Sequence, residues 1–227
     1  MVNVDTVYQR VLALANKEQR GYITPQEFNL FANQAQMDIF EQYFYDLNQF
    51  KRIPGNDSVY ADMTDIIEEK ISHFKTGPIV SSYEDLVPDS YRITDVSFSG
   101  KIAEEIRCED LHKTQNTPLT KATRNRPIWY RKEGKMYWEP QPPSLTNASI
   151  NYIRKPNDVN WTYIVVGEKA LVNNSASAGY KDFELHPSEE TKLVIKILGL
   201  AGITLKDPAL YQIAGAEDNK NIQQEKQ

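Results

Sequence analysis

The residues with the most reactive side chains are one cysteine and three histidines. Cys108 and His112 lie four positions apart, a spacing that suits half of a zinc site or a thiol–imidazole pair. A zinc site needs about four ligands, and the other histidines, His73 and His186, are distant in the sequence. A lone cysteine on a strand is usually a small, semi-buried residue. We therefore expect neither a metal site nor a nucleophilic cysteine.

Three pairs of adjacent acids are the next candidates for chemistry: Glu104 with Glu105, Glu109 with Asp110, and Glu189 with Glu190. Neighbours on a strand point to opposite faces, so the first two pairs are poorly placed to work as a general acid and base. Neither common form of phosphate-binding glycine loop is present. We expect no catalytic residue, no cofactor and no enzymatic activity.

Residues 16–27 align with the twelve-residue loop of an EF-hand, with Gly21 at the turn and Glu27 at the end. The alignment fails at a ligand position, where Arg20 replaces an oxygen donor, and Pro25 stiffens the end of the loop. Calcium needs several oxygen ligands with enough negative charge. Gly21 is better interpreted as a backbone turn before a capped helix.

A basic strip is the clearest charged feature, because residues 112–132 contain six lysines and arginines and no acid. Three interpretations remain open: contact with nucleic acid, a solvated loop beside an edge strand guarded by cations, and a docking surface for an acidic partner. The residues that would contact a partner or DNA are Lys121, Arg124, Arg126, Arg131 and Lys132.

The composition is that of an ordinary globular protein, with 40% hydrophobic and 25% charged residues in a chain of 227. A net charge of -5 and a pI near 5.3 argue against general attraction to nucleic acid. One cysteine excludes an intramolecular disulfide. No signal peptide is visible, and the longest apolar run is short for a membrane span and is broken by Lys196, so no membrane contact is expected.

The elements that must position these residues are organised around a long helix over residues 24–50. Thr24, Pro25 and Glu27 form an N-cap, a first-turn proline and a capping box. Spacings of three and four place one apolar stripe on this helix, and a second, thinner stripe lies roughly opposite. A helix that is apolar on two sides needs cover on two sides, from its own core or from another subunit. The interface hypothesis names Leu30, Met37, Phe44, Phe28, Phe31 and Tyr43.

Helices are also predicted at residues 4–16, with Asp5 as N-cap, at 64–74, at 187–205 and from 208. Strands are predicted at 91–98, 101–109, 128–131, 136–139, 148–154 and 161–166, with Gly134 in the turn of a hairpin. The expected fold is α+β: a helical bundle made by residues 1–76 and 181–227, with a small antiparallel β domain, 77–180, inserted between them.

Three stretches carry a resemblance to a known family. They are RGYITPQEFNLFANQAQMDIFEQYF, RPIWYRKEGKMYWEPQPP and DFELHPSEETKLVIKILGLAGITLKDPALYQIA. Together they resemble virion ring or adaptor proteins at the portal vertex of crAss-like and related short-tailed bacteriophages. The resemblance spans most of the chain, although none of its motifs is a catalytic signature.

The resemblance implies a helical body with a β insertion and a homo-oligomeric ring, commonly twelvefold. Such rings stack between the portal protein and further tail proteins in the virion, and double-stranded DNA passes through the channel without sequence-specific binding. Particles of this kind are assembled in the host cytoplasm. A ring subunit needs two different adhesive faces, because its interface is heterologous and closes by rotation.

The alternative is a monomeric module whose β domain binds single-stranded nucleic acid or a glycan. Its binding surface would combine residues 121–132 with Trp129, Tyr130 and Trp138, because aromatic side chains beside cations can stack on bases.

Overall fold

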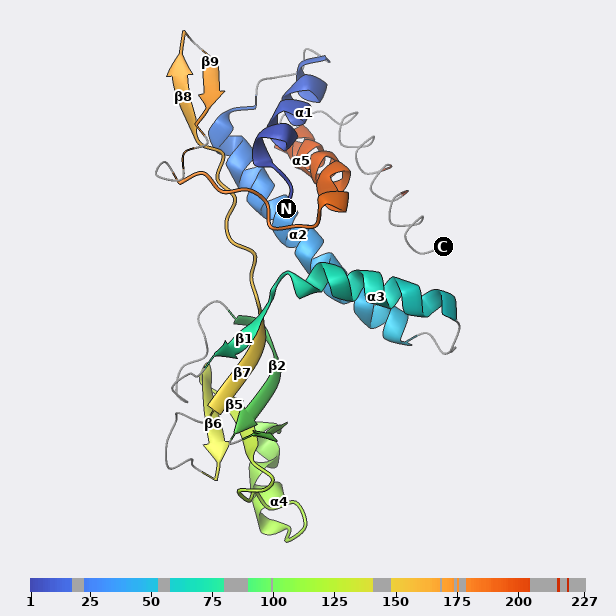
Figure 1. Cartoon of the computed structure of the whole chain (residues 1–227), viewed down its shortest axis with the longest axis vertical. Coiled ribbons are helices and arrows are strands. Elements are labelled where there is room, and N and C mark those ends of the chain that lie inside the picture. Colours follow the sequence, from blue (N-terminus) through green and yellow to red (C-terminus); the bar gives the residue numbers. More distant parts are fainter. Residues whose placement is uncertain are drawn as a thin grey trace. The chain divides into compact units, whose positions relative to one another are not determined.

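The computed structural model describes residues 1–17, 23–52, 58–79, 90–98, 100–140, 148–167, 169–173, 175, 179–204, 216 and 220 (Figure 1). These residues form helices and sheets, in agreement with the α+β prediction. The chain divides into two compact units. The helical unit comprises Met1–His73 and Pro156–Gln227, and the β unit comprises Phe74–Lys155.

The boundaries of the β unit differ from the predicted 77–180. It begins at Phe74 because the chain passes from the third helix directly into a paired strand. It ends at Lys155, and residues 156–180 group with the helical unit. The reason is hydrogen bonding, because backbone groups between residues 157 and 161 bond to side chains of the long helix.

Helix α1, Val4–Lys17, is capped by Asn3 rather than by Asp5. The Asn3 Oδ1 accepts a hydrogen bond from the Thr6 N–H at 3.0 Å. Asp5 instead accepts a hydrogen bond from the indole Nε1–H of Trp161 at 2.9 Å. The first turn is also tied to the C-terminal half of the chain, because the Val4 N–H donates to the Asp182 Oδ1 at 2.8 Å.

Helix α2, Pro25–Arg52, begins with the predicted capping box. The Thr24 N–H and Oγ1–H donate to the Glu27 Oε2 at 2.9 and 2.7 Å, and the Glu27 N–H donates to the Thr24 Oγ1 at 3.3 Å. These hydrogen bonds lower the pKa of Glu27, with the backbone N–H of Thr24 as the largest cause. The predicted turn at Gly21 lies outside the described residues.

The other helices of this unit pack around α2. Helix α3, Ser58–Ser72, starts earlier than predicted, since no proline or glycine interrupts residues 58–63. A 3₁₀ turn, η4 at Pro187–Glu189, leads into α5, Glu190–Thr204. Helix α2 contacts α3 and α5, and α1 contacts α5 (Figure 1). The predicted final helix from residue 208 lies outside the described residues apart from 216 and 220.

The β unit contains two sheets. The first has the order β1-β7-β2-β3, and the second has the order β4-β5-β6. The strands are β1 Lys75–Ile79, β2 Ser90–Phe98, β3 Lys101–Ile102, β4 Glu104–Glu105, β5 Ile128–Lys132, β6 Lys135–Glu139 and β7 Ala148–Arg154. The predicted 101–109 strand is split: β3 pairs with β2 as expected, whereas β4 leaves β2 and pairs with β5. The prediction is wrong from Ile106 on, where the chain leaves the sheet for a 3₁₀ turn.

The hairpin of β5 and β6 follows the prediction, with Glu133 and Gly134 both at positive φ in the turn. A short 3₁₀ turn, η1 at Cys108–Asp110, and helix α4, Leu111–Asn116, fill the connection from β4 to β5. The core of the unit is formed by residues from both sheets: Val96, Phe98, Ala103, Trp129, Met136, Trp138, Ile150 and Tyr152.

A two-stranded hairpin, β8 at Tyr163–Val166 and β9 at Lys169–Val172, belongs to the helical unit. The sequence predicted only its first strand. Within the described part of the chain, every helix is too short or too polar to cross a lipid bilayer.

Candidate functional site

A ladder of side-chain amides on α2 determines which way this helix faces. The Asn29 Oδ1 accepts from the Trp161 N–H at 2.9 Å, while its Nδ2 donates to the Trp161 carbonyl at 3.2 Å. Asn33 repeats this pattern with Val159, at 2.7 and 3.1 Å. Each asparagine therefore satisfies both backbone groups of one residue, as a neighbouring strand would.

Gln36 completes the ladder. Its Nε2 donates to the Asn157 carbonyl at 2.8 Å, and its Oε1 accepts from the Glu184 N–H at 3.1 Å. Four residues of helix rise about 6 Å and two residues of extended chain span about 6.6 Å, so helix positions 29 and 33 can match chain positions 161 and 159. We name Asn29, Asn33 and Gln36 the amide ladder. The sequence analysis missed it, although amides spaced by four and three on a helix are a visible signal.

The amide ladder borders the predicted main apolar stripe of α2, and that stripe is buried within the chain. Phe28, Ala35 and Ile39 are fully buried, and Tyr43 is 3% exposed. Phe28 and Tyr43 therefore cannot contribute a free surface to another subunit, which corrects the interface hypothesis for these two residues. Phe31 is half-buried.

The second stripe of α2 remains at the surface. Leu30 is 70% exposed, and Met37 and Phe44 are half-buried. Phe44 packs edge-on against Phe40, with ring centroids 5.0 Å apart. The segment from Phe28 to Met37 contains no charged residue. On the exposed side of α2, Leu30 and Met37 lie beside the polar Gln34 and the charged Glu41, because residues three and four apart share one side of a helix. We name Leu30, Phe31 and Met37 the Leu30 face.

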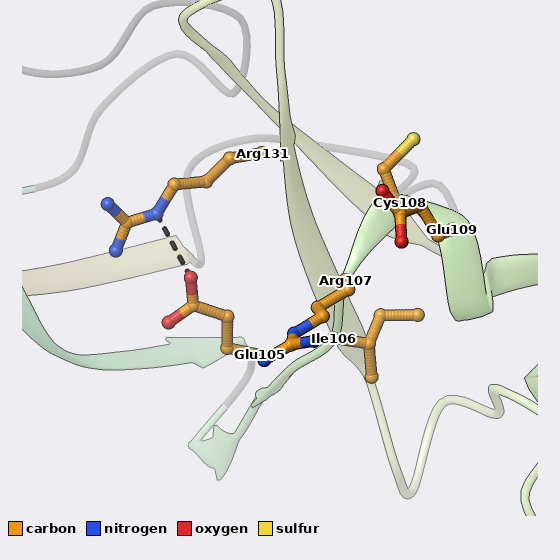
Figure 2. A pocket seen from close by; sticks show the side chains of 6 residues that line it. All are labelled: Glu105, Ile106, Arg107, Cys108, Glu109 and Arg131. Carbon is orange, nitrogen blue, oxygen red and sulfur yellow. Dashed lines mark ion pairs between the residues drawn. The ribbon is translucent and has the colours of Figure 1, made fainter.

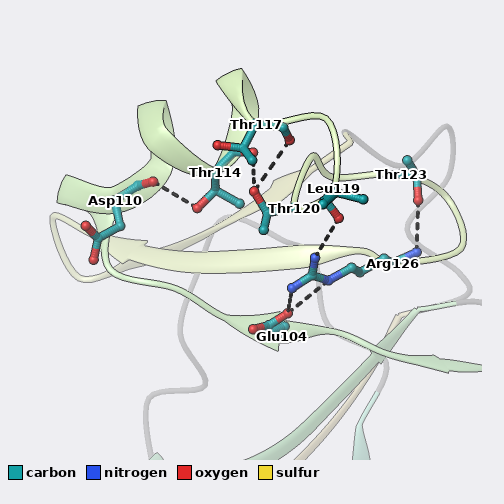
Figure 3. Close-up of polar contacts among 8 residues, drawn as sticks. All are labelled: Glu104, Asp110, Thr114, Thr117, Leu119, Thr120, Thr123 and Arg126. Atoms are coloured by element: carbon teal, nitrogen blue, oxygen red, sulfur yellow. Dashed lines mark hydrogen bonds and ion pairs between the residues drawn. The ribbon is translucent and has the colours of Figure 1, made fainter.

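The basic strip is largely paired with acids that lie outside it in the sequence. The guanidinium of Arg126 donates to the Glu104 Oε2 from Nε at 3.1 Å and from Nη2 at 2.6 Å, and its Nη1 donates to the Leu119 carbonyl (Figure 3). The Arg131 Nε lies 3.0 Å from the Glu105 Oε1, and its guanidinium lies over the Trp129 ring. Strand β4 supplies both carboxylates, because it pairs with β5 in parallel.

Threonine side chains order the loop that carries the strip. The Thr114 Oγ1–H donates to the Asp110 carbonyl at 2.9 Å, and the Thr120 Oγ1–H donates to the Thr114 carbonyl at 3.1 Å (Figure 3). The Thr123 Oγ1 accepts from the Arg126 N–H at 3.2 Å. These hydrogen bonds hold the loop against α4 and give it a defined path.

The Lys132 Nζ lies 3.8 Å from the Glu133 Oε1. Lys121 and Arg124 are exposed, and neither forms an ion pair with another residue that the structure describes. Of the five predicted contact residues, these two cations remain for a partner. The arrangement fits the interpretation of a solvated edge guarded by paired cations better than that of a continuous track for a phosphate backbone.

A shallow depression of about 670 Å³ lies beside this strip (Figure 2). It is lined by Glu105, Ile106, Arg107, Cys108, Glu109 and Arg131. Cys108 is exposed on η1, not semi-buried on a strand as expected. No group of three or more histidine, cysteine or acidic side chains that could hold a metal ion occurs among the residues the structure describes.

The aromatic residues proposed for the alternative function divide between two faces of the β5–β6 hairpin. Trp129 and Trp138 pair across the strands and are buried in the core, so neither can stack on a ligand. Tyr130 and Tyr137 pair on the other face, where their rings stack with centroids 5.4 Å apart. Burial, followed by the nearby Glu139, raises the pKa of Tyr130. Of the three aromatic residues named for the alternative binding surface, Trp129 and Trp138 are therefore buried and only Tyr130 remains near the surface.

Two histidines that are distant in the sequence lie together in the fold. His73, after α3, stacks on His186, before η4, with ring centroids 6.1 Å apart. The His186 Nδ1 accepts from the Ser188 N–H and caps η4. The adjacent acids have structural partners, since Glu189 is buried against Lys70 at 2.6 Å and Glu190 pairs with Arg10 at 2.8 Å.

Comparison of the chain with protein-family models gives no match, and comparison with curated proteins gives none. The interpretation of function therefore depends on the surfaces described above and on the resemblance seen in the sequence.

Proposed function

We propose that this chain is a structural subunit of a ring at the portal vertex of a bacteriophage, where it joins the portal to the tail around the DNA channel. The single observation that carries the proposal is the Leu30 face. Leu30 exposes a large apolar side chain to water, which is unfavourable, and a neighbouring subunit would remove that surface from water.

The amide ladder supports this role, because it leaves α2 little freedom to rotate. The helix is held to the segment around Val159 and Trp161 by hydrogen bonds on one side. The side of α2 opposite the buried Phe28 and Ile39 therefore presents Leu30 in a fixed position, as a preorganised interface requires. In a ring each subunit uses two different faces, so a second surface elsewhere on the chain must complement this one.

The charge distribution is compatible with a passage for DNA. The net charge of -5 opposes adhesion of a polyanion, and the pairing of Arg126 and Arg131 with carboxylates reduces local attraction. Lys121 and Arg124 are then available for acidic groups on the portal or on an adjacent ring. The proposed location is the virion, after assembly in the host cytoplasm, and the role is structural, without catalysis, cofactor or membrane contact.

Mass photometry of the purified chain, alone and with the portal protein of the same phage, tests this proposal. We expect a discrete particle of roughly twelve times the 26.1 kDa chain mass, either free or on the portal. Leu30→Glu should reduce the assembled fraction, because it places a charge in the buried contact. Gln9→Glu adds the same charge at an exposed position of α1 and serves as the matched control.

A chain that remains monomeric under both conditions would refute the ring. If such a monomer bound a single-stranded oligonucleotide with strong salt dependence, the alternative function would replace it. Substitution of Tyr130 and Tyr137 would then abolish that binding, because they are the stacked aromatic pair outside the core of the hairpin.

A further inference from the structure

The loop between α4 and β5 presents an exposed leucine among exposed cations. Leu119 is 91% exposed, and Lys121 and Arg124 on the same loop are exposed as well. A third exposed cation joins them from β3, because the Lys101 Nζ donates a hydrogen bond to the Asn125 Oδ1. None of the three cations forms an ion pair with another residue that the structure describes. We name Lys101, Leu119, Lys121 and Arg124 the Leu119 patch.

The path of this loop is fixed by contacts with its own unit. The Arg126 Nη1 donates to the Leu119 carbonyl at 3.3 Å, while the same guanidinium binds Glu104 on β4 (Figure 3). Thr123 forms an isolated β-bridge with Arg126. The patch is therefore preorganised, and the Glu104 charge does not offset its cations because Arg126 already neutralises that carboxylate.

A surface of this kind selects an acidic protein partner that has an apolar residue among its acids. Exposed cations attract and orient an acidic surface, but an exposed ion pair by itself contributes little to affinity. Contact with an apolar side chain at Leu119 has to supply the rest. A phosphate backbone would pair with the cations and leave Leu119 without an apolar contact, so the mixture of side chains favours protein over nucleic acid.

Helix α3 of the same chain carries a surface with this chemistry. Asp65, Ile66 and Glu69 are exposed, and Ile66 is 46% exposed. Successive helix residues are about 100° apart, so these three side chains fall within one arc of about 100°. Lys70, at the border of this arc, is already paired with the buried Glu189 at 2.6 Å. We name Asp65, Ile66 and Glu69 the α3 acidic face.

We propose that the Leu119 patch of one copy docks on the α3 acidic face of the next copy. Cations then meet carboxylates, and Leu119 meets Ile66. Each copy carries both surfaces, so the contact is heterologous and repeats around an axis until a ring closes. The inference rests on the proposed ring function and assigns Lys121 and Arg124 a partner within the same ring.

Charge reversal on each surface tests the contact by mass photometry. The patch variant carries Lys121→Glu and Arg124→Glu, and the helix variant carries Asp65→Lys and Glu69→Lys. All four residues are exposed, so both variants should keep the fold of the unmodified chain, which circular dichroism verifies. Each variant places like charges on the two surfaces that meet. We expect the assembled fraction of each variant alone to fall at least tenfold.

A matched control reverses two cations elsewhere in the β unit. Lys132 and Lys135 are exposed and pair with each other beside the turn of the β5–β6 hairpin. Lys132→Glu with Lys135→Glu therefore makes the same change in net charge as the patch variant. We expect this control to assemble like the unmodified chain.

An equimolar mixture of the patch variant and the helix variant gives the most specific result. In the patch variant both surfaces are net negative, and in the helix variant both are net positive. Contacts between unlike copies are therefore attractive again. We expect the mixture to recover the ring with the two variants alternating, and native mass spectrometry should find them in equal numbers.

Several results would overturn this contact and leave the ring function standing. One is a wild-type ring that is weakened by neither variant or by only one of them. Another is a pair of variants that fail alone and do not recover when mixed. A wild-type chain that never assembles, alone or with the portal, would refute both the contact and the ring.

Discussion

The amide ladder makes a quantitative prediction for Asn33→Ala. The substitution removes two hydrogen bonds and leaves the N–H and carbonyl of Val159 without their partner. Val159 is 2% exposed, and an unsatisfied buried backbone group costs about 1–3 kcal/mol. Because Asn33 itself is half-buried, water reaches part of the site, and we take the low end for each group. The free energy of unfolding should therefore fall by about 2 kcal/mol.

Urea denaturation followed by circular dichroism measures this loss, and native-state hydrogen exchange locates it. The Val159 amide should exchange faster in the variant, because its acceptor is gone. Asn48→Ala is the matched control, since it makes the same chemical change at an exposed position of α2. Exposed substitutions usually change stability by less than about 0.5 kcal/mol.

Two results would refute the reasoning about the ladder. One is an equal shift of the urea midpoint in Asn33→Ala and Asn48→Ala. The other is a Val159 amide whose exchange rate does not change. Either would mean that the segment from residue 157 to 161 is held by packing alone and that α2 is not oriented by its amides.

Three further substitutions test local features. Hydrogen bonds lower the pKa of Glu27 below 4.5, so its stabilisation is present above that pH and is lost as the pH falls through the lowered pKa. Glu27→Gln should have a lower Tm than the wild type at pH 7, and the difference should shrink as the pH is lowered below 4.5. Gly77→Ala would place a Cβ 2.4 Å from the Asn151 Oδ1 at a φ of +148°, so urea denaturation should show a loss of about 2 kcal/mol or more. Lys70→Met leaves the buried Glu189 carboxylate without its ion-pair partner and should cost about 3 kcal/mol in the same assay, and addition of Glu189→Gln should recover part of it.

The features that the sequence predicted correctly depend on neighbours along the chain. The capping box of α2 needs only Thr24 and Glu27, which are three residues apart. The buried stripe of α2 follows from the helical period, and the β5–β6 hairpin follows from a turn in which Gly134 takes a positive φ. In each case a short segment contains all of the interacting groups.

The features that were missed or misplaced depend on contacts between distant segments. Asn33 and Val159 are 126 positions apart, and nothing in either segment identifies the other. The basic strip contains no acid of its own, so nothing in its sequence showed that its cations are paired. The parallel pairing of β4 with β5 brings Glu104 to Arg126. Periodicity likewise identified two apolar stripes on α2 without showing that Phe28 is covered by its own chain and Leu30 is not.

The way the chain enters and leaves the β unit has a consequence for loop entropy. The Phe74 carbonyl accepts a hydrogen bond from the Arg154 N–H at 3.0 Å, so the two ends of this excursion are joined by the pairing of β1 with β7. Closing a flexible loop of about 80 residues would otherwise cost about 4 kcal/mol, beyond a constant term. Because the pairing of β1 with β7 holds the two ends together, the helical unit does not bear this entropic cost. The number of residues between β2 and β7 can therefore vary without lowering the stability of the helical unit.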